Sequence, residues 1–293
     1  MSLIERAVGH LGSGGDRNAR RGSARRDPAS EDIAGASVRH GVAQAPVNPE
    51  RRLTIDLKRL ARRGYVIPDG KQHLTAQEFR VIKRPLLANA LDQGPAPVEN
   101  GRRIMVTSSV PGEGKTFCAI NLAMSFAAER DIRTLLVDAD VARPKILKEL
   151  GVESRPGLMD WLVSDKFDLD DLVLPTSIDK LDVLPAGRRN RNATELLASA
   201  AMSRLLDEIS QRYPEHVVIF DSPPLLVTTE ARVLASYMGQ VVMVVAAMST
   251  PQEAVRDALD MVDENEVVGM VLNKSKAHQS GNGYGYGYGH IGR

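Results

Sequence analysis

From about residue 101 onward, short apolar runs alternate with segments of helical periodicity. The runs are nearly continuous in apolar residues, which is typical of strands buried on both faces of a parallel sheet. We predict strands at Ile104–Thr107, Thr134–Asp138, Leu181–Leu184, Val217–Phe220, Gln240–Ala246 and Val267–Leu272. We predict helices around residues 116–130, 143–150, 157–163, 193–212, 229–237 and 251–264. This alternation predicts an α/β fold with a doubly wound, mostly parallel sheet.

The first hundred residues lack that alternation. Residues 12–49 are rich in Gly, Ser, Ala, Arg and Asp without apolar periodicity, so we predict a mostly disordered segment over residues 1–50. Residues 51–100 are expected to form a helical extension and a linker, with a basic helix at Arg51–Arg63 and another helix at Thr75–Ala90.

Two of these N-terminal segments leave alternatives open. Residues 1–11 carry an apolar stripe that fits either docking on a partner or membrane, or a frayed terminus. The basic residues of 51–63 fit either a solvated face or attraction to anionic lipid.

The charge, the cysteine count and the length of the apolar runs limit which partners and sites the chain is expected to have. The chain has 293 residues and a net charge of +1, so nothing in its charge balance predicts a nucleic-acid partner. The single cysteine, Cys118, excludes an internal disulfide and a multi-cysteine metal site within one chain. No run reaches the roughly 18 to 20 apolar residues that span a bilayer, so we expect a cytoplasmic protein.

The most informative candidate binding motif is the segment Ser108–Thr116, between the first predicted strand and the following helix. Glycines 112 and 114 allow backbone N–H groups to approach phosphate oxygens, and the helix N-terminus adds partial positive charge. Lys115 can reach the outer phosphates, and the Thr116 hydroxyl can bind Mg²⁺. The segment therefore predicts a phosphate-binding loop for a nucleoside triphosphate.

Ser109 stands where the pattern G-x-x-x-x-G-K-[ST] has its first glycine. One alternative is a chance Gly-Lys-Thr on a surface loop. Another is a dinucleotide-binding loop beginning at Gly112, but its third glycine would fall on Phe117. The order of strand, loop and helix favours the triphosphate site.

Acidic residues follow two further predicted strands. Asp138 and Asp140 end the second strand, and Asp221 ends the strand that precedes Pro223. Ligands of such sheets bind at the carboxyl ends of strands, so these carboxylates are candidates for organising Mg²⁺ together with Thr116. One of them could also accept the proton of an attacking hydroxyl.

The C-terminal segment 276–293 contains three tyrosines separated by single glycines, Tyr284, Tyr286 and Tyr288. Glycine does not hold a helix, so we predict a flexible tail that can present its hydroxyl groups to an active site as phosphate acceptors. The alternative is a low-complexity end that self-associates through its aromatic rings.

These motifs resemble the bacterial tyrosine kinase (BY-kinase) family, and especially the cytoplasmic tyrosine autokinases of exosortase and exopolysaccharide systems. The resemblance extends from about Leu53 to the C-terminus. Its motifs are the loop Ser109–Thr116, LLVDADVARP at Leu135–Pro144, VVIFDSPP at Val217–Pro224, Val271–Lys274 and the tyrosine tail. The stretch Gln77–Lys83 approximates the family's E-x-x-R-x-x-R helix, with the acid one position late and lysine as its last residue.

The resemblance implies a P-loop NTPase fold of the MinD/ParA-like type, with a kinase domain over residues 101–275 that uses ATP and Mg²⁺. It implies autophosphorylation of the tail between subunits of a homo-oligomer. It also implies a membrane-embedded polysaccharide chain-length or co-polymerase protein as activator, recruitment by that partner to the inner face of the plasma membrane, and a cognate tyrosine phosphatase.

The expected site follows from the loop, the acids and the resemblance together. Expected catalytic residues are Lys115, Asp138, Asp140 and Asp221, and expected metal ligands are Thr116, Asp138 and Asp221. Expected nucleotide contacts are Ser109, Pro111, Gly112, Glu113, Gly114, Lys115, Thr116 and Phe117, with Asn273 as an adenine contact implied by the resemblance.

Two rival functions share these features. A MinD/ParA-like switch ATPase would use the same sheet and acidic segment to control dimerisation. A non-catalytic adaptor would regulate polysaccharide assembly through nucleotide-dependent docking. The switch ATPase gives no reason for the tyrosine tail, and the adaptor would tolerate loss of phosphorylation.

Overall fold

A computed structural model describes residues 51–68, 74–164, 166–262 and 267–275 of the chain, and these residues belong to one compact unit. The predicted disordered segment at residues 1–50 and the tyrosine tail at 276–293 lie outside the described residues, so both remain predictions.

A seven-stranded sheet forms the centre of the molecule, in the order β3-β4-β2-β5-β1-β6-β7. Neighbouring strands run parallel except for the β3–β4 pair, which is antiparallel. The strands are β1 (Arg103–Ser108), β2 (Arg133–Asp138), β3 (Leu174–Pro175), β4 (Leu181–Leu184), β5 (His216–Asp221), β6 (Gln240–Ala246) and β7 (Val267–Asn273). The predicted doubly wound, mostly parallel sheet is confirmed.

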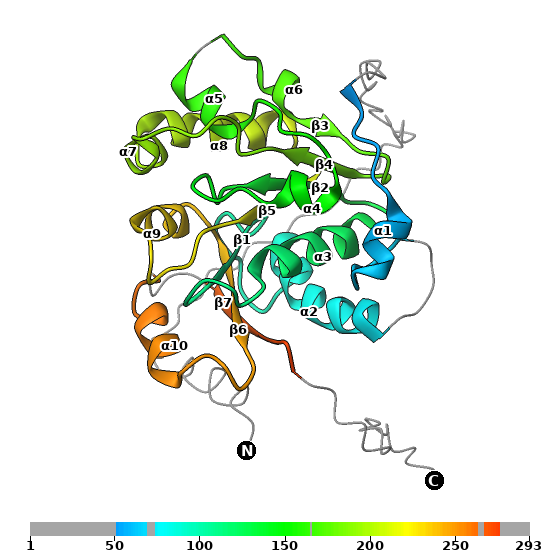
Figure 1. Cartoon of the computed structure of the whole chain (residues 1–293), viewed down its shortest axis with the longest axis vertical. Helices are drawn as coiled ribbons and strands as arrows, with labels where there is room; N and C mark the ends of the chain where they lie inside the picture. The colour runs from blue at the N-terminus through cyan, green and yellow to red at the C-terminus, as the bar shows by residue number, and fades with distance from the viewer. Residues whose placement is uncertain (1–50, 69–73, 165, 263–266, 276–293) are drawn as a thin grey trace, which may run out of the picture. The chain divides into compact units, whose positions relative to one another are not determined.

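Helices cover both faces of this sheet (Figure 1). They are α1 (Leu57–Arg62), α2 (Leu74–Ala90), α3 (Lys115–Ala127), α4 (Ile146–Leu150), α5 (Leu158–Val163), α6 (Leu169–Leu172), α7 (Ala193–Leu197), α8 (Ala200–Arg212), α9 (Thr229–Ala235) and α10 (Gln252–Leu259). Within β1, Ile104 and Val106 pack into the apolar cluster that includes α2 and α3, whereas Met105 packs into the cluster that includes α8 and α9. The alternation of side chains along each strand therefore feeds two cores, one on each face.

Residues 51–63 do not form the single helix that we predicted. Leu53 pairs with Thr176 beside the sheet, Ile55 donates its N–H to the Ser177 hydroxyl, and the helix begins only at Leu57. Leu53 and Ile55 alternate with polar residues, which is the period of an extended chain. Both side chains are buried with Leu60 in the main core, so the apolar part of this segment is not available to a membrane.

The predicted helix over residues 193–212 is divided in two. Ser199 interrupts it, because its backbone is extended and its hydroxyl accepts the Ala201 N–H as the N-cap of α8. Short α6 and β3 were not predicted, since four and two residues are too few for a periodic pattern. No helix in the described part of the chain is long and apolar enough to cross a membrane.

The order of strands determines where the predicted site residues meet. β5 lies between β1 and β2, and all three are parallel, so their carboxyl ends share one edge. Asp138 and Asp221 are direct neighbours in the register of β2 and β5. The loop after β1 therefore lies beside both carboxylates, as expected for a ligand site at the carboxyl edge.

Candidate active site

The phosphate-loop backbone has the conformation that its glycines allow. Gly112 and Gly114 lie at φ 88° and 102°, a left-handed region that glycine enters without a steric penalty. Gly114 is the N-cap of α3, and no side chain caps the helix there. The first N–H groups of α3 are thus left to bind an anion.

The Glu113 side chain holds the loop from inside the protein. Its carboxylate accepts the Val110 N–H at 2.7 Å and the Ala246 N–H at 3.2 Å, and it also accepts the Thr250 hydroxyl. It is 2% exposed. Glu113 therefore ties the loop to the end of β6, and only its backbone is placed to meet a nucleotide.

Two residues at the end of β7 also support the loop. The Asn273 amide donates to the Glu113 carbonyl at 2.8 Å, and the Lys274 ammonium donates to the Gly112 carbonyl at 2.6 Å. A Cβ atom on Gly114 would collide with the Asn273 amide. Asn273 thus lies against the phosphate loop, and its expected contact with adenine remains a prediction.

The remaining loop residues divide between interior and surface. The Ser109 side chain is buried against Met243, and Ser109 keeps a negative φ, so a glycine is not required at this position. Pro111 is exposed. The Phe117 ring packs on Tyr65, with ring centroids 5.0 Å apart, so only its backbone remains for a phosphate.

Lys115 lies among buried carboxylates. Its ammonium is 2.6 Å from Asp140 Oδ2 and 3.8 Å from Asp221 Oδ1. Asp140 also caps the turn after β2, because its Oδ1 accepts the Arg143 N–H at 3.1 Å. Without nucleotide, Asp140 is therefore the counter-ion that holds the lysine beside the loop.

Asp138 has one oxygen fixed and one free. Its Oδ2 accepts the N–H groups of Lys145 at 3.0 Å and Ile146 at 2.9 Å, whereas its buried Oδ1 has no hydrogen-bond partner among the described residues. Asp138 also lines a cavity of about 220 Å³ between α4 and the end of β4. The backbone bonds orient the carboxylate, and the free oxygen can accept a proton or a cation.

The site holds an excess of buried negative charge. Both oxygens of Asp221 are buried without a hydrogen-bond partner in the described structure. Burial, followed by the charge of Asp221, raises the pKa of Asp138. Burial also raises the pKa of Asp221, although the Lys115 charge and the neighbouring Thr116 hydroxyl oppose this shift. Such groups require a proton or a cation nearby.

These orphaned oxygens fit Mg²⁺ bound jointly with a nucleotide. Among the described residues, no three His, Cys, Asp or Glu side chains converge into a complete metal cage. That is expected, because Mg²⁺ keeps several waters and takes one or two carboxylates together with substrate phosphates. Thr116, Asp138 and Asp221 are the residues that could hold it.

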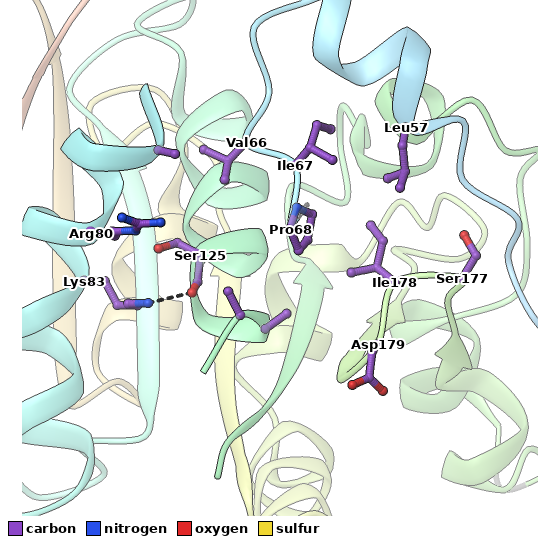
Figure 2. A pocket seen from close by; sticks show the side chains of 13 residues that line it. Leu57, Val66, Ile67, Pro68, Arg80, Lys83, Ser125, Ser177, Ile178 and Asp179 are labelled. Carbon is purple, nitrogen blue, oxygen red and sulfur yellow. Dashed lines mark hydrogen bonds between the residues drawn. The ribbon is translucent and has the colours of Figure 1, made fainter. Parts of the chain in front are cut away.

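A larger cavity of about 520 Å³ lies elsewhere, between α2, the end of α3 and the turn before β4 (Figure 2). Figure 2 shows the Lys83 ammonium directed to the Ser125 carbonyl of α3, at 2.7 Å. Lys83 is buried and also pairs with Glu129 at 2.5 Å. The last residue of the stretch resembling E-x-x-R-x-x-R is therefore used inside the chain, whereas Arg80 lines the cavity.

The structure brings together the predicted loop and the three predicted aspartates, while the acceptor tyrosines 284, 286 and 288 lie outside the described residues. Sequence reasoning missed the structural role of the Glu113 side chain and its partner Thr250. An acid between two glycines was a local signal for Glu113. Nothing local pointed to Thr250, which is 137 positions away.

Comparison with known proteins places these features in a family. Residues 101–266 match the family model described as an AAA domain. The Tyrosine-protein kinase YwqD of Bacillus subtilis is 30% identical over 69% of this chain and 82% of its own length. The Succinoglycan biosynthesis transport protein ExoP of Rhizobium meliloti is 31% identical over 78% of this chain, but only 28% of its own length is covered.

A solved structure gives the same assignment. The kinase domain of VpsO matches with a TM-score of 0.59 and 33% identity, covering 69% of this chain and 96% of that domain. The fold, the phosphate loop with its three aspartates, and these relatives agree. The chain belongs to the AAA-domain family of P-loop nucleotide-binding proteins and, within it, to the bacterial tyrosine kinases.

Proposed function

We propose that this protein is an ATP-dependent protein-tyrosine autokinase that phosphorylates Tyr284, Tyr286 and Tyr288 of its C-terminal tail. The observation that carries the proposal is the state of Asp138. One of its oxygens is fixed by two backbone N–H groups, the other is free, and the side chain borders the cavity between α4 and the end of β4. A base in that position suits an acceptor hydroxyl that enters through the cavity.

The loop residues have distinct roles in this proposal. The backbone N–H groups at Gly112–Thr116 and the Lys115 ammonium bind the phosphates of ATP, and Lys115 leaves Asp140 to do so. Thr116 and Asp221 would hold Mg²⁺ and Asp138 would organise its ligands, and the bound ion would neutralise charge on the phosphate oxygens. Asn273 adjoins the loop on the side where we place the adenine.

In the transfer itself, the tyrosine oxygen forms a bond to the γ-phosphorus as the bond from that phosphorus to the β–γ bridging oxygen breaks. The phenolic proton passes to Asp138 Oδ1, and ADP carries away the bridging oxygen. The raised pKa of Asp138 makes its carboxylate a stronger base than an exposed aspartate.

The wider role rests on the relatives. ExoP is named for succinoglycan biosynthesis and transport, so we extend the proposal to control of exopolysaccharide synthesis or export. We place the protein in the cytoplasm, recruited to the inner face of the plasma membrane by a membrane-embedded co-polymerase partner. We also propose a homo-oligomer in which subunits exchange phosphate, and a cognate tyrosine phosphatase that reverses the modification.

Phosphotyrosine mapping tests the function. The purified full chain is incubated with ATP and Mg²⁺ and digested, and modified tyrosines are located by mass spectrometry. The proposal predicts phosphate on the tail tyrosines and at least tenfold less total phosphotyrosine when all three are changed to Phe. Unmodified tail tyrosines, alongside ATP hydrolysis, would contradict it.

A further inference from the structure

The cavity beside Asp138 carries two cationic side chains. The cavity has a volume of about 220 Å³, and Lys148 of α4 and Arg155 of the following loop both line its wall. Both side chains are exposed, and neither forms an ion pair with any residue that the structure describes. Leu147 and Val152 add apolar surface to the same wall. This combination suits an anion carried on an apolar body, such as an aromatic ring.

The dimensions suit one side chain and its neighbour on the same segment. A cavity of 220 Å³ is about 6 Å across, and alternate side chains of an extended chain stand roughly 6.6 Å apart on one face. Tyr284, Tyr286 and Tyr288 have this alternate spacing, with glycine between them. One tyrosine can therefore meet Asp138 while the next contacts the cationic wall.

The unmodified Gly-Tyr repeat offers these cations no negative charge. The stretch from Gly283 to Gly289 contains only glycine and tyrosine. Phosphorylation of one tyrosine adds a charge of about −1.5 to −2 and three strong acceptor oxygens. The cations thus have a partner on this repeat only after a first transfer has occurred.

We propose that Lys148 and Arg155 form a phosphotyrosine-binding subsite that holds an already phosphorylated tyrosine and so presents its neighbour two residues away to Asp138. This inference rests on the proposed kinase function. Tail phosphorylation is then sequential: the first phosphate is added unaided, and each later one is accelerated by the phosphate before it. The subsite takes no part in the transfer, so Lys148 and Arg155 are positioning residues.

Synthetic tail peptides of residues 276–293 test this directly. Both peptides keep Tyr286 as the single acceptor and have Tyr284→Phe. The primed peptide carries phosphotyrosine at position 288, and the unprimed peptide has Tyr288→Phe. The enzyme is the full chain with its three tail tyrosines changed to Phe, so its own tail does not compete. The measured quantity is kcat/KM for each peptide.

Three enzymes are compared, and two of them carry matched charge changes. The test variant is Lys148→Ala with Arg155→Ala. The control is Lys58→Ala with Arg204→Ala, which removes the same two positive charges at exposed, unpaired positions outside the cavity lining. Any loss that follows from net charge alone will appear equally in both.

We expect the parent and the control to prefer the primed peptide at least fivefold, and the test variant to treat both peptides alike. The rate on the unprimed peptide should stay within twofold in all three, which also shows that the test variant is folded. Raising the salt concentration should reduce the preference in the parent enzyme.

Three results would overturn the subsite. They are equal rates on both peptides in the parent enzyme, a preference that survives in the test variant, and an equal fall on both peptides in that variant. The last would mean that the cations act on nucleotide or on every acceptor. A parent enzyme that phosphorylates neither peptide, with wild-type chain that gains no phosphotyrosine, would instead overturn the kinase function and the subsite together.

Discussion

The Lys115 ammonium is the group in the candidate site that can exchange a protein carboxylate for a phosphate. Lys115→Met keeps the aliphatic chain but removes the charge that pairs with Asp140. Loss of a preorganised charge at a transferring phosphate costs several kcal/mol, so autophosphorylation should fall by roughly a hundredfold or more. Phosphotyrosine formation by the purified variant measures this, with circular dichroism as the control for folding. Undiminished phosphotyrosine formation by the variant would show that Lys115 does not act in the site.

The buried carboxylate of Asp221 is expected to make the free energy of unfolding depend on pH. Its carboxylate is fully buried with no hydrogen-bond partner in the described structure, and burial raises its pKa above the ordinary 3.8. The folded state therefore binds this proton more tightly than the unfolded state, so the free energy of unfolding decreases as pH rises through the raised pKa. Below pH 3.8 the carboxyl is protonated in both states and contributes no difference.

Asp221→Asn should accordingly stabilise the nucleotide-free protein by about 1 to 2 kcal/mol at pH 8, with the gain vanishing near pH 4. Denaturant unfolding in a metal chelator at both pH values measures it. The same variant should lose Mg²⁺-dependent activity. A variant less stable than wild type at pH 8 would show that the charge is compensated in the folded protein.

Asp138→Asn separates orientation from chemistry. The amide keeps an oxygen that can accept the Lys145 and Ile146 N–H groups, so the local turn should persist. It cannot take the tyrosine proton, so transfer should fall about a hundredfold or more while ATP binding is retained. Transfer rates and nucleotide titration measure the two effects. Wild-type rates of both transfer and ATP hydrolysis would make this carboxylate structural only.

At the scale of elements, the loop conformation depends on one close contact. Gly112 and Gly114 both have positive φ, but only at Gly114 would a Cβ meet another group, the Asn273 amide. Gly112→Ala should therefore cost only backbone strain of about 1 to 2 kcal/mol, whereas Gly114→Ala should also displace the Asn273 amide from the Glu113 carbonyl. We expect a larger loss of nucleotide affinity for Gly114→Ala, measured by calorimetry.

Combining Gly114→Ala with Asn273→Ala should recover part of that loss, because the second change removes the obstructing amide. Gly112→Ala serves as the matched control, since Asn273→Ala should not rescue it. Equal losses for the two glycine variants would mean that contact with Asn273 does not govern the loop.

Much of this arrangement was predictable from the chain. The phosphate-binding role of Ser108–Thr116 could be predicted because glycine, lysine and threonine act at fixed spacing. The role of Asp138 and Asp221 could be predicted because both residues end apolar runs. The Glu113–Thr250 contact was not predictable, since it joins residues 137 positions apart through the pairing of β1 with β6. The prediction of a helix at Leu53 and Ile55 was wrong. Their extended backbone is held by contacts with the chain near Thr176, which is far away in the sequence.

For the whole molecule, the described sheet explains nucleotide binding, and the proposed acceptor function depends on a tail outside the described residues. The tail follows directly after β7, whose end supports the phosphate loop through Asn273 and Lys274. A Gly-rich segment of ten residues spans roughly 17 Å on average, and we propose that the tail tyrosines enter the site of a neighbouring subunit. Whether they do so decides whether the proposed autokinase acts across subunits.

The measurement that tests the central claim most directly mixes two chains, neither of which can phosphorylate its own tail, with ATP and Mg²⁺. One chain carries Lys115→Met and keeps its tail, and the other keeps its loop but has Tyr284, Tyr286 and Tyr288 changed to Phe. Mass spectrometry then assigns phosphotyrosine to each chain. We predict phosphate on the tail of the Lys115→Met chain only in the mixture. No labelling of either chain in the mixture, together with robust ATP hydrolysis and no phosphotyrosine on the wild-type chain assayed in parallel, would contradict the kinase and favour the switch ATPase.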